Sequence, residues 1–253
     1  MRVVDPPTDA ELAAALREPR LFAALSRYMQ PMRYELVVER KLGATLPAAM
    51  NLAVLIVAAL RIRTGSELLL PAFADYSWST IAAIVDGRCT AGLLEDVAQF
   101  RRVGEPTLVT AADLEWVWPR LPGLADLLEA PRFRLALDAL ATCRQEANPR
   151  LAAVKLWAGS EALMACGVDR HGRLAGRVAA VLEPRGPGRH EIYEQVTDLD
   201  AMRAHVLLSE LLSPDDIDGH LGEVRGLLAR LLRTIVDAGR LPTPAALDQS
   251  LFC

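Results

Sequence analysis

The sequence predicts a mainly α protein: an antiparallel helical bundle over residues 131–240, a mostly helical N-terminal region with a few short strands over residues 1–130, and a loose tail over residues 241–253. Three observations favour this fold class. Apolar residues recur at helical spacing, N-capping residues precede several of these segments, and Gly or Pro follows them. With 253 residues, 52% of them hydrophobic, the chain can bury a substantial core, which excludes intrinsic disorder.

The N-terminal region contains several predicted helices and one candidate strand. The helices are predicted over residues 9–16, 21–28, 46–60, 78–85, 93–100 and 110–118. Thr8 and Glu11 have capping-box spacing at the start of the first helix. Residues 34–40 (YELVVER) are rich in β-branched and aromatic side chains, which favours a strand, although their charges also fit a helix. Gly65 breaks the helical pattern, and an extended segment is expected after it.

The last helix before the bundle begins with a second capping box. Thr110 and Asp113 have the required spacing, and Pro119 and Pro122 are predicted to end the helix. The change in composition between Pro119 and Pro131 is the clearest internal boundary in the chain, so we place the start of the bundle there.

The bundle region carries the strongest helix signals. Its helices are predicted over residues 131–146, 149–166, 174–182, 190–212 and 214–238. Asn148 and Ser213 are N-caps, and each is followed by a proline at the first helical position. Gly167 and Gly239 are predicted to end the helices that these caps begin.

The most apolar run, residues 46–60, ends at Arg61 and is shorter than the roughly 20 residues that span a bilayer. We therefore predict a buried helix in a soluble, cytoplasmic protein without a membrane partner. The N-terminus lacks an apolar signal segment, which argues against secretion. The four cysteines are far apart and form no Cys-x-x-Cys pair, so neither a disulfide scaffold nor a zinc site is predicted.

The charge balance argues against a general nucleic-acid binder. Lys and Arg number 28 against 32 Asp and Glu, a formal net charge of −4, so any nucleic acid has to be held by a local patch. Arg170, Arg173 and Arg177 have the spacing of one helical stripe, which is a candidate binding surface. A solvated helix face is the simpler interpretation of these three residues.

The sequence contains no phosphate-binding Gly-rich loop, no serine nucleophile elbow and no His-Glu-x-x-His pair, so no metal and no cofactor are predicted. His171 and His190 lie in or beside Gly-rich turns, and His220 lies at the start of the last bundle helix; all three are expected at the surface. His205 differs because it follows Arg203 inside a helix with an apolar stripe. Residues two apart on a helix point in different directions, so these two side chains are not expected to act on one atom.

Glu161 is the most unusual carboxylate of the bundle. It lies in the middle of a helix, and its i±3 and i±4 neighbours are apolar or aromatic, so the side chain is expected to be at least half buried. A buried carboxylate needs a partner. We predict a structural ion pair between Glu161 and Arg203.

The bundle resembles the Apea-like group of HEPN domains. The resemblance rests on FRLALDAL, on LAAVKLWAGSEALM at the family's apolar helix ending in Leu-Glu-x-Leu, on GRLAGRVAAVL at its Arg-x-Ala-x-Leu-Leu helix, and on IYEQVTDLDAMRAHVLLSELLSP at its Tyr-x-x-Arg-Ser segment. Upstream, LAVLIVAALRIRTGSELLL resembles the region that precedes the domain in such proteins. The order and spacing of these segments cover about two thirds of the chain.

The resemblance implies a helical bundle, and many HEPN domains are metal-independent ribonucleases that dimerise around paired Arg-x4-6-His motifs. Arg203 is at the position of the family arginine, which holds phosphate, but Leu208 is where histidine is expected, and His205 has a different spacing. Loss of acid–base catalysis alone costs roughly 10²- to 10⁴-fold in rate. The expected function is therefore a non-catalytic interaction or scaffold component of a prokaryotic, defence-type multi-protein system, acting as a homodimer or with a protein partner.

Two alternatives remain open. The first is a metal-independent ribonuclease that cleaves RNA with Arg203 and a displaced histidine, either His205 or His220. The second is a nucleic-acid-binding module that uses the arginine stripe.

Overall fold

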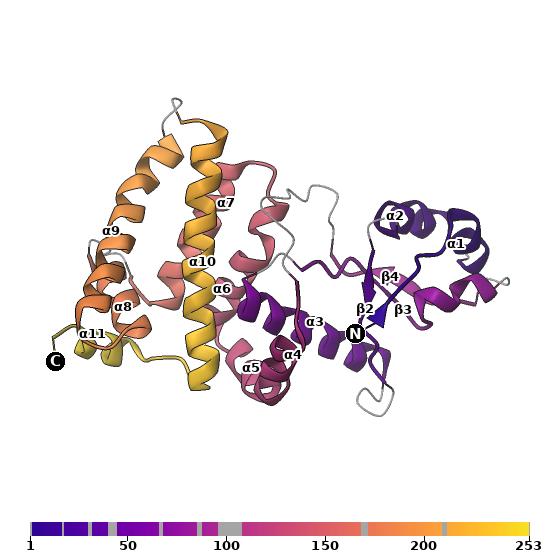
Figure 1. Ribbon diagram of the computed structural model, residues 1–253, viewed down its shortest axis with the longest axis horizontal. Helices are drawn as coiled ribbons and strands as arrows, with labels where there is room; N and C mark the ends of the chain where they lie inside the picture. Colours follow the sequence, from indigo (N-terminus) through magenta and orange to yellow (C-terminus); the bar gives the residue numbers. More distant parts are fainter. Residues whose placement is uncertain are drawn as a thin grey trace. The chain divides into compact units, whose positions relative to one another are not determined.

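The protein is mainly α, with α-helices α1 to α11 and short strands β1 to β4 (Figure 1). The computed structural model describes residues 2–16, 18–29, 32–39, 45–65, 68–84, 88–95, 108–167, 172–208 and 212–252. The chain forms two compact units: unit 1 comprises Met1–Val57 and Leu69–Ala98, and unit 2 comprises Ala58–Leu68 and Gln99–Cys253. The boundary predicted at residue 130 falls inside unit 2.

Unit 1 combines short helices with two two-stranded antiparallel sheets, β1–β2 and β3–β4. Its elements are β1 (Arg2–Val3), α1 (Asp9–Ala15), α2 (Pro19–Met29), β2 (Tyr34–Glu35), β3 (Ala72–Ala74), the 3₁₀ helix η1 (Trp78–Ala83) and β4 (Ala91–Leu93). The first two predicted helices are confirmed, and Thr8 and Glu11 form the predicted capping box.

Three predictions for unit 1 needed correction. The candidate strand at residues 34–40 is limited to Tyr34–Glu35, because only these residues pair with β1. The helix predicted from Trp78 is a 3₁₀ helix that ends at Ala83. The helix predicted from Leu93 is wrong at its start, since Leu93 pairs with Ala72 in a sheet. Val85 and residues 96–100 lie outside the described residues.

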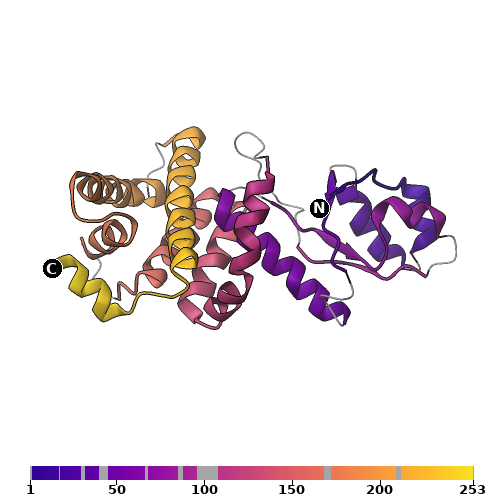
Figure 2. The same ribbon diagram turned by 60° about the horizontal axis from the view of Figure 1, so that its bottom comes forward.

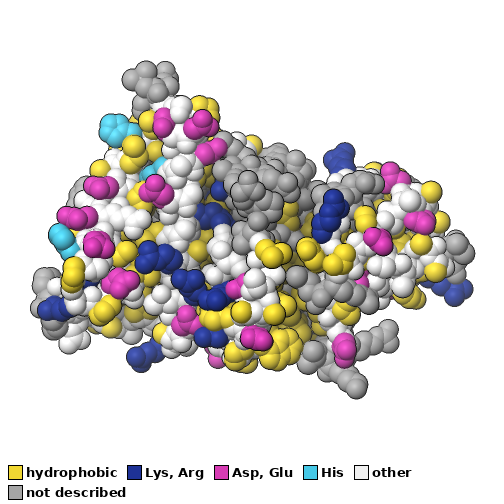
Figure 3. Space-filling view, in the orientation of Figure 1, with side chains coloured by type: hydrophobic (Ala, Val, Ile, Leu, Met, Phe, Trp, Pro, Cys, Tyr) yellow, Lys and Arg dark blue, Asp and Glu magenta, His cyan; other side chains and the backbone are white. Residues whose placement is uncertain are grey.

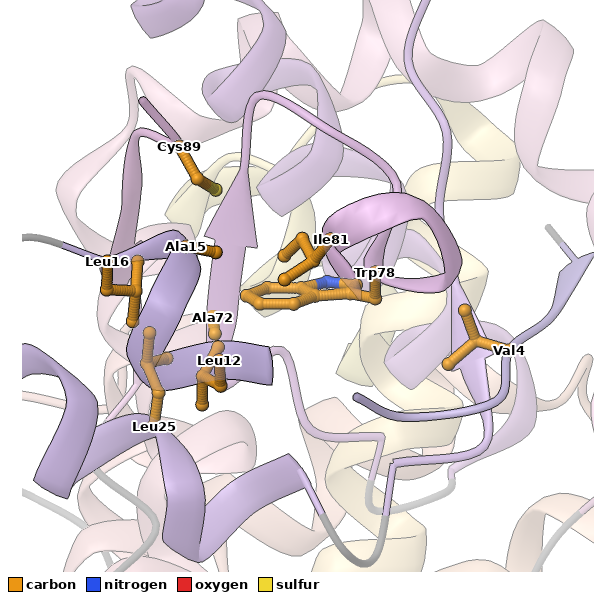
Figure 4. Close-up of a cluster of buried hydrophobic side chains, with 9 residues drawn as sticks. All are labelled: Val4, Leu12, Ala15, Leu16, Leu25, Ala72, Trp78, Ile81 and Cys89. Atoms are coloured by element: carbon orange, nitrogen blue, oxygen red, sulfur yellow. The ribbon is translucent and has the colours of Figure 1, made fainter. Parts of the chain in front are cut away.

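The core of unit 1 forms around the indole of Trp78. Leu12, Ala15, Ala72 and Ile81 are buried beside it (Figure 4). The backbone N–H of Trp78 donates a hydrogen bond of 3.0 Å to the carboxylate of Glu35, which is itself buried. Because this carboxylate also accepts a bond from the Ser77 hydroxyl, it fixes the start of η1 against β2.

Helix α3 (Leu46–Thr64) is longer than the predicted apolar run, because Arg61 and Arg63 continue it. By length and composition it is a helix that could cross a membrane, although core helices of soluble proteins pass the same test. Residues 56–62 are buried, as expected of a core helix, whereas the first turn is exposed. The buried Arg61 donates a hydrogen bond of 2.8 Å from Nε to the carbonyl of Leu68.

Unit 2 is a helical bundle. Its elements after α3 are α4 (Ala111–Val117), η2 (Trp118–Arg120), α5 (Leu121–Leu128), α6 (Pro131–Thr142), η3 (Cys143–Gln145), α7 (Pro149–Leu163), α8 (Arg173–Leu182), α9 (Pro187–Leu208), α10 (Pro214–Ala238) and α11 (Pro244–Phe252). The capping interactions predicted for Thr110, Asn148 and Ser213 are all present. Gly239 ends α10 in the left-handed conformation, as predicted.

The longest helix, α10, packs against α5 to α9 (Figure 1). Trp157 of α7 and Phe133 of α6 are fully buried in this bundle. Helices α6 and α7 approach closely at Gly159, where an added Cβ would lie 2.7 Å from the Cβ of Ala139. Glycine at this position therefore sets the spacing of the two helices.

The helix predicted over residues 110–118 is confirmed as α4, which ends at Val117 just before Pro119. Pro119 and Pro122 each occupy the first turn of a further element, η2 or α5. Two other predictions for unit 2 were wrong. Helix α7 ends at Leu163 rather than near Gly167, because the chain already turns at Ala165, which has φ 52°. The tail is not loose, because α11 packs on α8 (Figure 2). Leu247 of α11 is buried.

Candidate functional site

The ion pair predicted between Glu161 and Arg203 is present. Arg203 Nη1 of α9 lies 2.5 Å from Glu161 Oε1 of α7, and both side chains are mostly buried, with exposed fractions of 19% and 18%. Asp200 lies one turn before Arg203 on α9, with Oδ1 3.7 Å from the same Nη1. Arg203 thus faces two carboxylates, and its ion pair with Glu161 joins α9 to α7.

The Arg203 guanidinium also lies over the indole of Trp157, with its Cζ 5.2 Å from the ring centroid. Such a contact between a cation and an aromatic face is favourable when it is shielded from water. The indole N–H of Trp157 donates a hydrogen bond of 3.2 Å to Nε2 of His220. Glu161, Arg203, Trp157 and His220, which we call the polar cluster, therefore form a continuous chain of contacts across α7, α9 and α10.

His220 was expected at the surface, and this prediction is wrong: the residue is only 6% exposed. Because Nε2 accepts from Trp157, the neutral imidazole carries its proton on Nδ1, which has no hydrogen-bond partner among the described residues. Burial lowers the pKa of His220; the charge of Glu223 raises it, and that of Arg203 lowers it further. At neutral pH the imidazole of His220 is therefore uncharged, and the lone pair of its Nε2 accepts the hydrogen bond from Trp157.

His205 does not join the polar cluster. It is exposed on α9, whereas Arg203 is turned inward toward α7. Leu208, at the position expected for the family histidine, is 82% exposed. The structure thus confirms that Arg203 and His205 point in different directions, and it brings Arg203 together with Glu161 and His220 instead.

Arg177, the last residue of the predicted arginine stripe, does not face solvent. Arg177 is 1% exposed, and its Nη1 donates bonds of 2.6 Å to the carbonyls of Met164 and Ala165. Its Nη2 lies 2.5 Å from Asp248 of α11. Arg173 is partly exposed and lies 3.9 Å from the same carboxylate, and Arg170 lies outside the described residues.

Cys166, whose backbone N–H donates a hydrogen bond of 3.1 Å to the carbonyl of Glu161, is fully buried. Burial raises the pKa of its thiol to about 11, so the sulfur is protonated at neutral pH and is a poor nucleophile. Within the described ranges, no group of three His, Cys, Asp or Glu side chains is placed to hold a metal ion. The chemistry of the cluster is therefore that of a paired, hydrogen-bonded network that joins three helices.

Sequence reasoning missed two features of this region. The first is the burial of His220, which the apolar neighbours Ile217, Leu221 and Val224 on α10 could have indicated. The second is a set of arginines on the outer side of the bundle, Arg63, Arg230 and Arg233, which lie together because α3 and α9 flank α10 there. The spacing of Arg230 and Arg233 could have predicted that they share one face of α10. Nothing in the sequence indicated that Arg63 of α3 lies beside them.

No family model matches the chain, and neither a curated protein nor a solved structure matches it. The fold and the polar cluster therefore identify only a broad structural class, that of a mainly α protein whose larger unit is a helical bundle.

Proposed function

We propose that this chain is a non-catalytic, cytoplasmic interaction protein, similar to Apea-like HEPN domains, that serves a prokaryotic defence-type assembly and associates with a second copy of itself. The observation that carries this proposal is the engagement of Arg203. Its guanidinium is bound to Glu161 and stacked on Trp157, so the phosphate-holding role that the resemblance assigns to it is replaced by a structural one.

The acid–base partner that a ribonuclease requires is also engaged. The Nε2 of His220 accepts the indole N–H of Trp157, and a base needs a free lone pair to take a proton from a 2′-hydroxyl. His205 has an accessible imidazole but lies on another face of α9. These positions favour a bundle whose central arginine stabilises the fold.

A surface suited to self-association lies on α7. Leu151, Val154 and Ala158 follow one another at i, i+3 and i+7, and all three are exposed, with exposed fractions of 50% and 41% for the first two. This strip lies where α9 crosses α7, since Arg150 Nη1 donates a bond of 2.6 Å to the carbonyl of Val206. Apolar helix faces of this kind are buried in symmetric dimers, in which the same patch serves both subunits.

The test is the mass of the purified protein in solution, measured by size-exclusion chromatography with light scattering. We expect a dimer for the wild type and a monomer for the double variant Leu151→Gln/Val154→Gln. Tyr193→Gln is the matched control, because Tyr193 is also exposed but lies about 20 Å from Val206 along α9. A wild-type protein that is strictly monomeric and binds no other protein contradicts the proposal.

A metal-independent ribonuclease is the second candidate, and one observation favours it: the charge of Arg203 acts on His220, so an arginine and a displaced histidine do share one cluster. RNA incubated with the protein in EDTA distinguishes the two. Our first proposal predicts no cleavage. Cleavage that is lost in Arg203→Lys and in either His220→Gln or His205→Gln, with the fold retained, establishes the ribonuclease instead.

A further inference from the structure

A groove of about 360 Å³ runs along the outer side of α10, between the end of α3 and α9, and lies wholly within unit 2. Among the described residues that line it, the charged ones are Arg63, Arg230, Arg233 and Glu223. Its described lining therefore holds three cationic side chains and one carboxylate. Figure 3 shows Lys and Arg side chains gathered over the lower half of α10 on this side of the molecule.

The three arginines differ in how fully they are paired. Like Arg203, Arg63 contacts a carboxylate and an indole: its Nε lies 3.0 Å from Asp113, and its Cζ lies 5.8 Å from the ring centroid of Trp116. Arg230 is 3.9 Å from Glu183, and both of these side chains are about 40% exposed, so the attraction is weak. Arg233 is half-buried and makes no hydrogen bond or ion pair with any residue that the structure describes.

The wall of the groove formed by α10 is bare at Gly226. A Cβ added there would meet no atom within 4 Å, so a ligand can approach the helix backbone at this point. Arg230 and Arg233 follow at i+4 and i+7, on the same face of α10. The groove thus combines a wall without side-chain atoms at Gly226 with two arginines on the same face of α10.

We propose that this groove binds a small phosphate-bearing ligand, with one or two phosphate groups held by Arg63, Arg230 and Arg233. Guanidinium forks match the oxygen geometry of phosphate and form charge-assisted hydrogen bonds to it. The volume lies at the lower end of the range for small-molecule sites. An extended nucleic acid fits less well, because Glu183 and Glu223 interrupt the positive surface.

Pyrophosphate is the probe, and its binding to the full chain is measured by isothermal titration calorimetry at low ionic strength. We expect binding that weakens as salt is added, because these groups are partly exposed. Gly226→Glu adds a carboxylate beside the groove at a position where the Cβ meets no atom within 4 Å, and it is expected to weaken binding at least about 10-fold. Gly222→Glu is the matched control: it lies one turn earlier on α10, also in open space, and does not line the groove.

A second pair of variants tests the arginines directly. Arg233→Gln is expected to weaken pyrophosphate binding roughly 10-fold, whereas Arg134→Gln, at an exposed position of α6 outside the groove, is expected to leave it unchanged. Equal affinity in Gly226→Glu, Arg233→Gln and the wild type overturns the proposal. So does a wild-type protein that fails to bind pyrophosphate at millimolar concentration, including one that instead binds a short single-stranded RNA through Arg233.

Discussion

Two sets of arginines in unit 2 differ in how fully their guanidinium groups are paired with hydrogen-bond acceptors and carboxylates. Inside the bundle, Arg177 binds two backbone carbonyls and a carboxylate, and Arg203 binds a carboxylate and an indole. On the outer side of α10, Arg230 has only a long contact to a carboxylate, and Arg233 has no partner among the described residues. The composition, in which all but two of the 28 basic residues are arginine, does not distinguish the two sets.

The comparison indicates that the inner arginines, Arg177 and Arg203, stabilise the fold, whereas the outer arginines, Arg230 and Arg233, are available to bind a ligand. Burying a guanidinium costs free energy unless hydrogen bonds and ion pairs compensate for the lost water, so the contacts of Arg177 and Arg203 are part of what stabilises the fold. A partly exposed guanidinium is hydrated and contributes little to stability until a ligand arrives. Substitutions in the inner set should therefore change stability, and substitutions in the outer set should change binding.

The largest effect is expected for Arg177→Met. This change removes the donor shared by the carbonyls of Met164 and Ala165, which hold the turn after α7, and we expect the free energy of unfolding to fall by about 3 kcal/mol. Urea unfolding followed by circular dichroism measures the loss. Asp248→Asn is the control and should cost far less, because that carboxylate is partly exposed and the two carbonyl contacts of Arg177 remain. Equal losses in the two variants would show that the ion pair, not the carbonyl contacts, dominates.

The second effect concerns the Glu161–Arg203 pair. Glu161→Gln is expected to lower the free energy of unfolding by about 1–2 kcal/mol, because the guanidinium loses a charged partner in a mostly buried site. A double-mutant cycle with Arg203→Gln should give a coupling energy of about 1 kcal/mol. Unchanged stability in Glu161→Gln would remove the argument that this arginine is structural.

The pair also illustrates what could be predicted from the sequence. Local signals were sufficient for most helix starts, because a cap such as Ser213 and its acceptor lie within one turn. The burial of Glu161 followed from its apolar neighbours on the same helix, and Arg203 followed from the need for an opposite charge. Each of these predictions depended on residues close in sequence or on one strong electrostatic requirement.

The features that were missed depend on contacts between distant segments. Arg177 appeared to be a surface residue because its acceptors are backbone carbonyls, which no side-chain pattern reveals. The docking of α11 requires Asp248 to meet Arg177, 71 positions earlier in the chain. The groove needs Arg63 beside Arg233, and only the packing of α3 on the bundle places them together.

The third effect is a pH dependence of stability. Burial holds the pKa of His220 below its ordinary value, so in mildly acidic solution the unfolded chain binds a proton that the folded chain does not. Stability should therefore be fully retained above the unfolded pKa of about 6.5 and decrease as pH falls below it. Unfolding by urea at pH 7.5 and 5.5 measures this change. His220→Gln, which keeps an acceptor for Trp157, should lose less stability over the same interval; an identical loss would assign the effect to another group.

The smallest effect is expected on the outer side of α10 and has the opposite sign. Gly226→Ala should raise the free energy of unfolding by about 0.5–1 kcal/mol, because alanine favours a helix interior and the added Cβ meets open space. Gly159→Ala should destabilise the protein, since its Cβ would lie 2.7 Å from that of Ala139. Thermal unfolding of both variants measures the contrast. Destabilisation by Gly226→Ala would mean that another surface covers this face in solution, and the outer arginines would then belong to an interface rather than to an open groove.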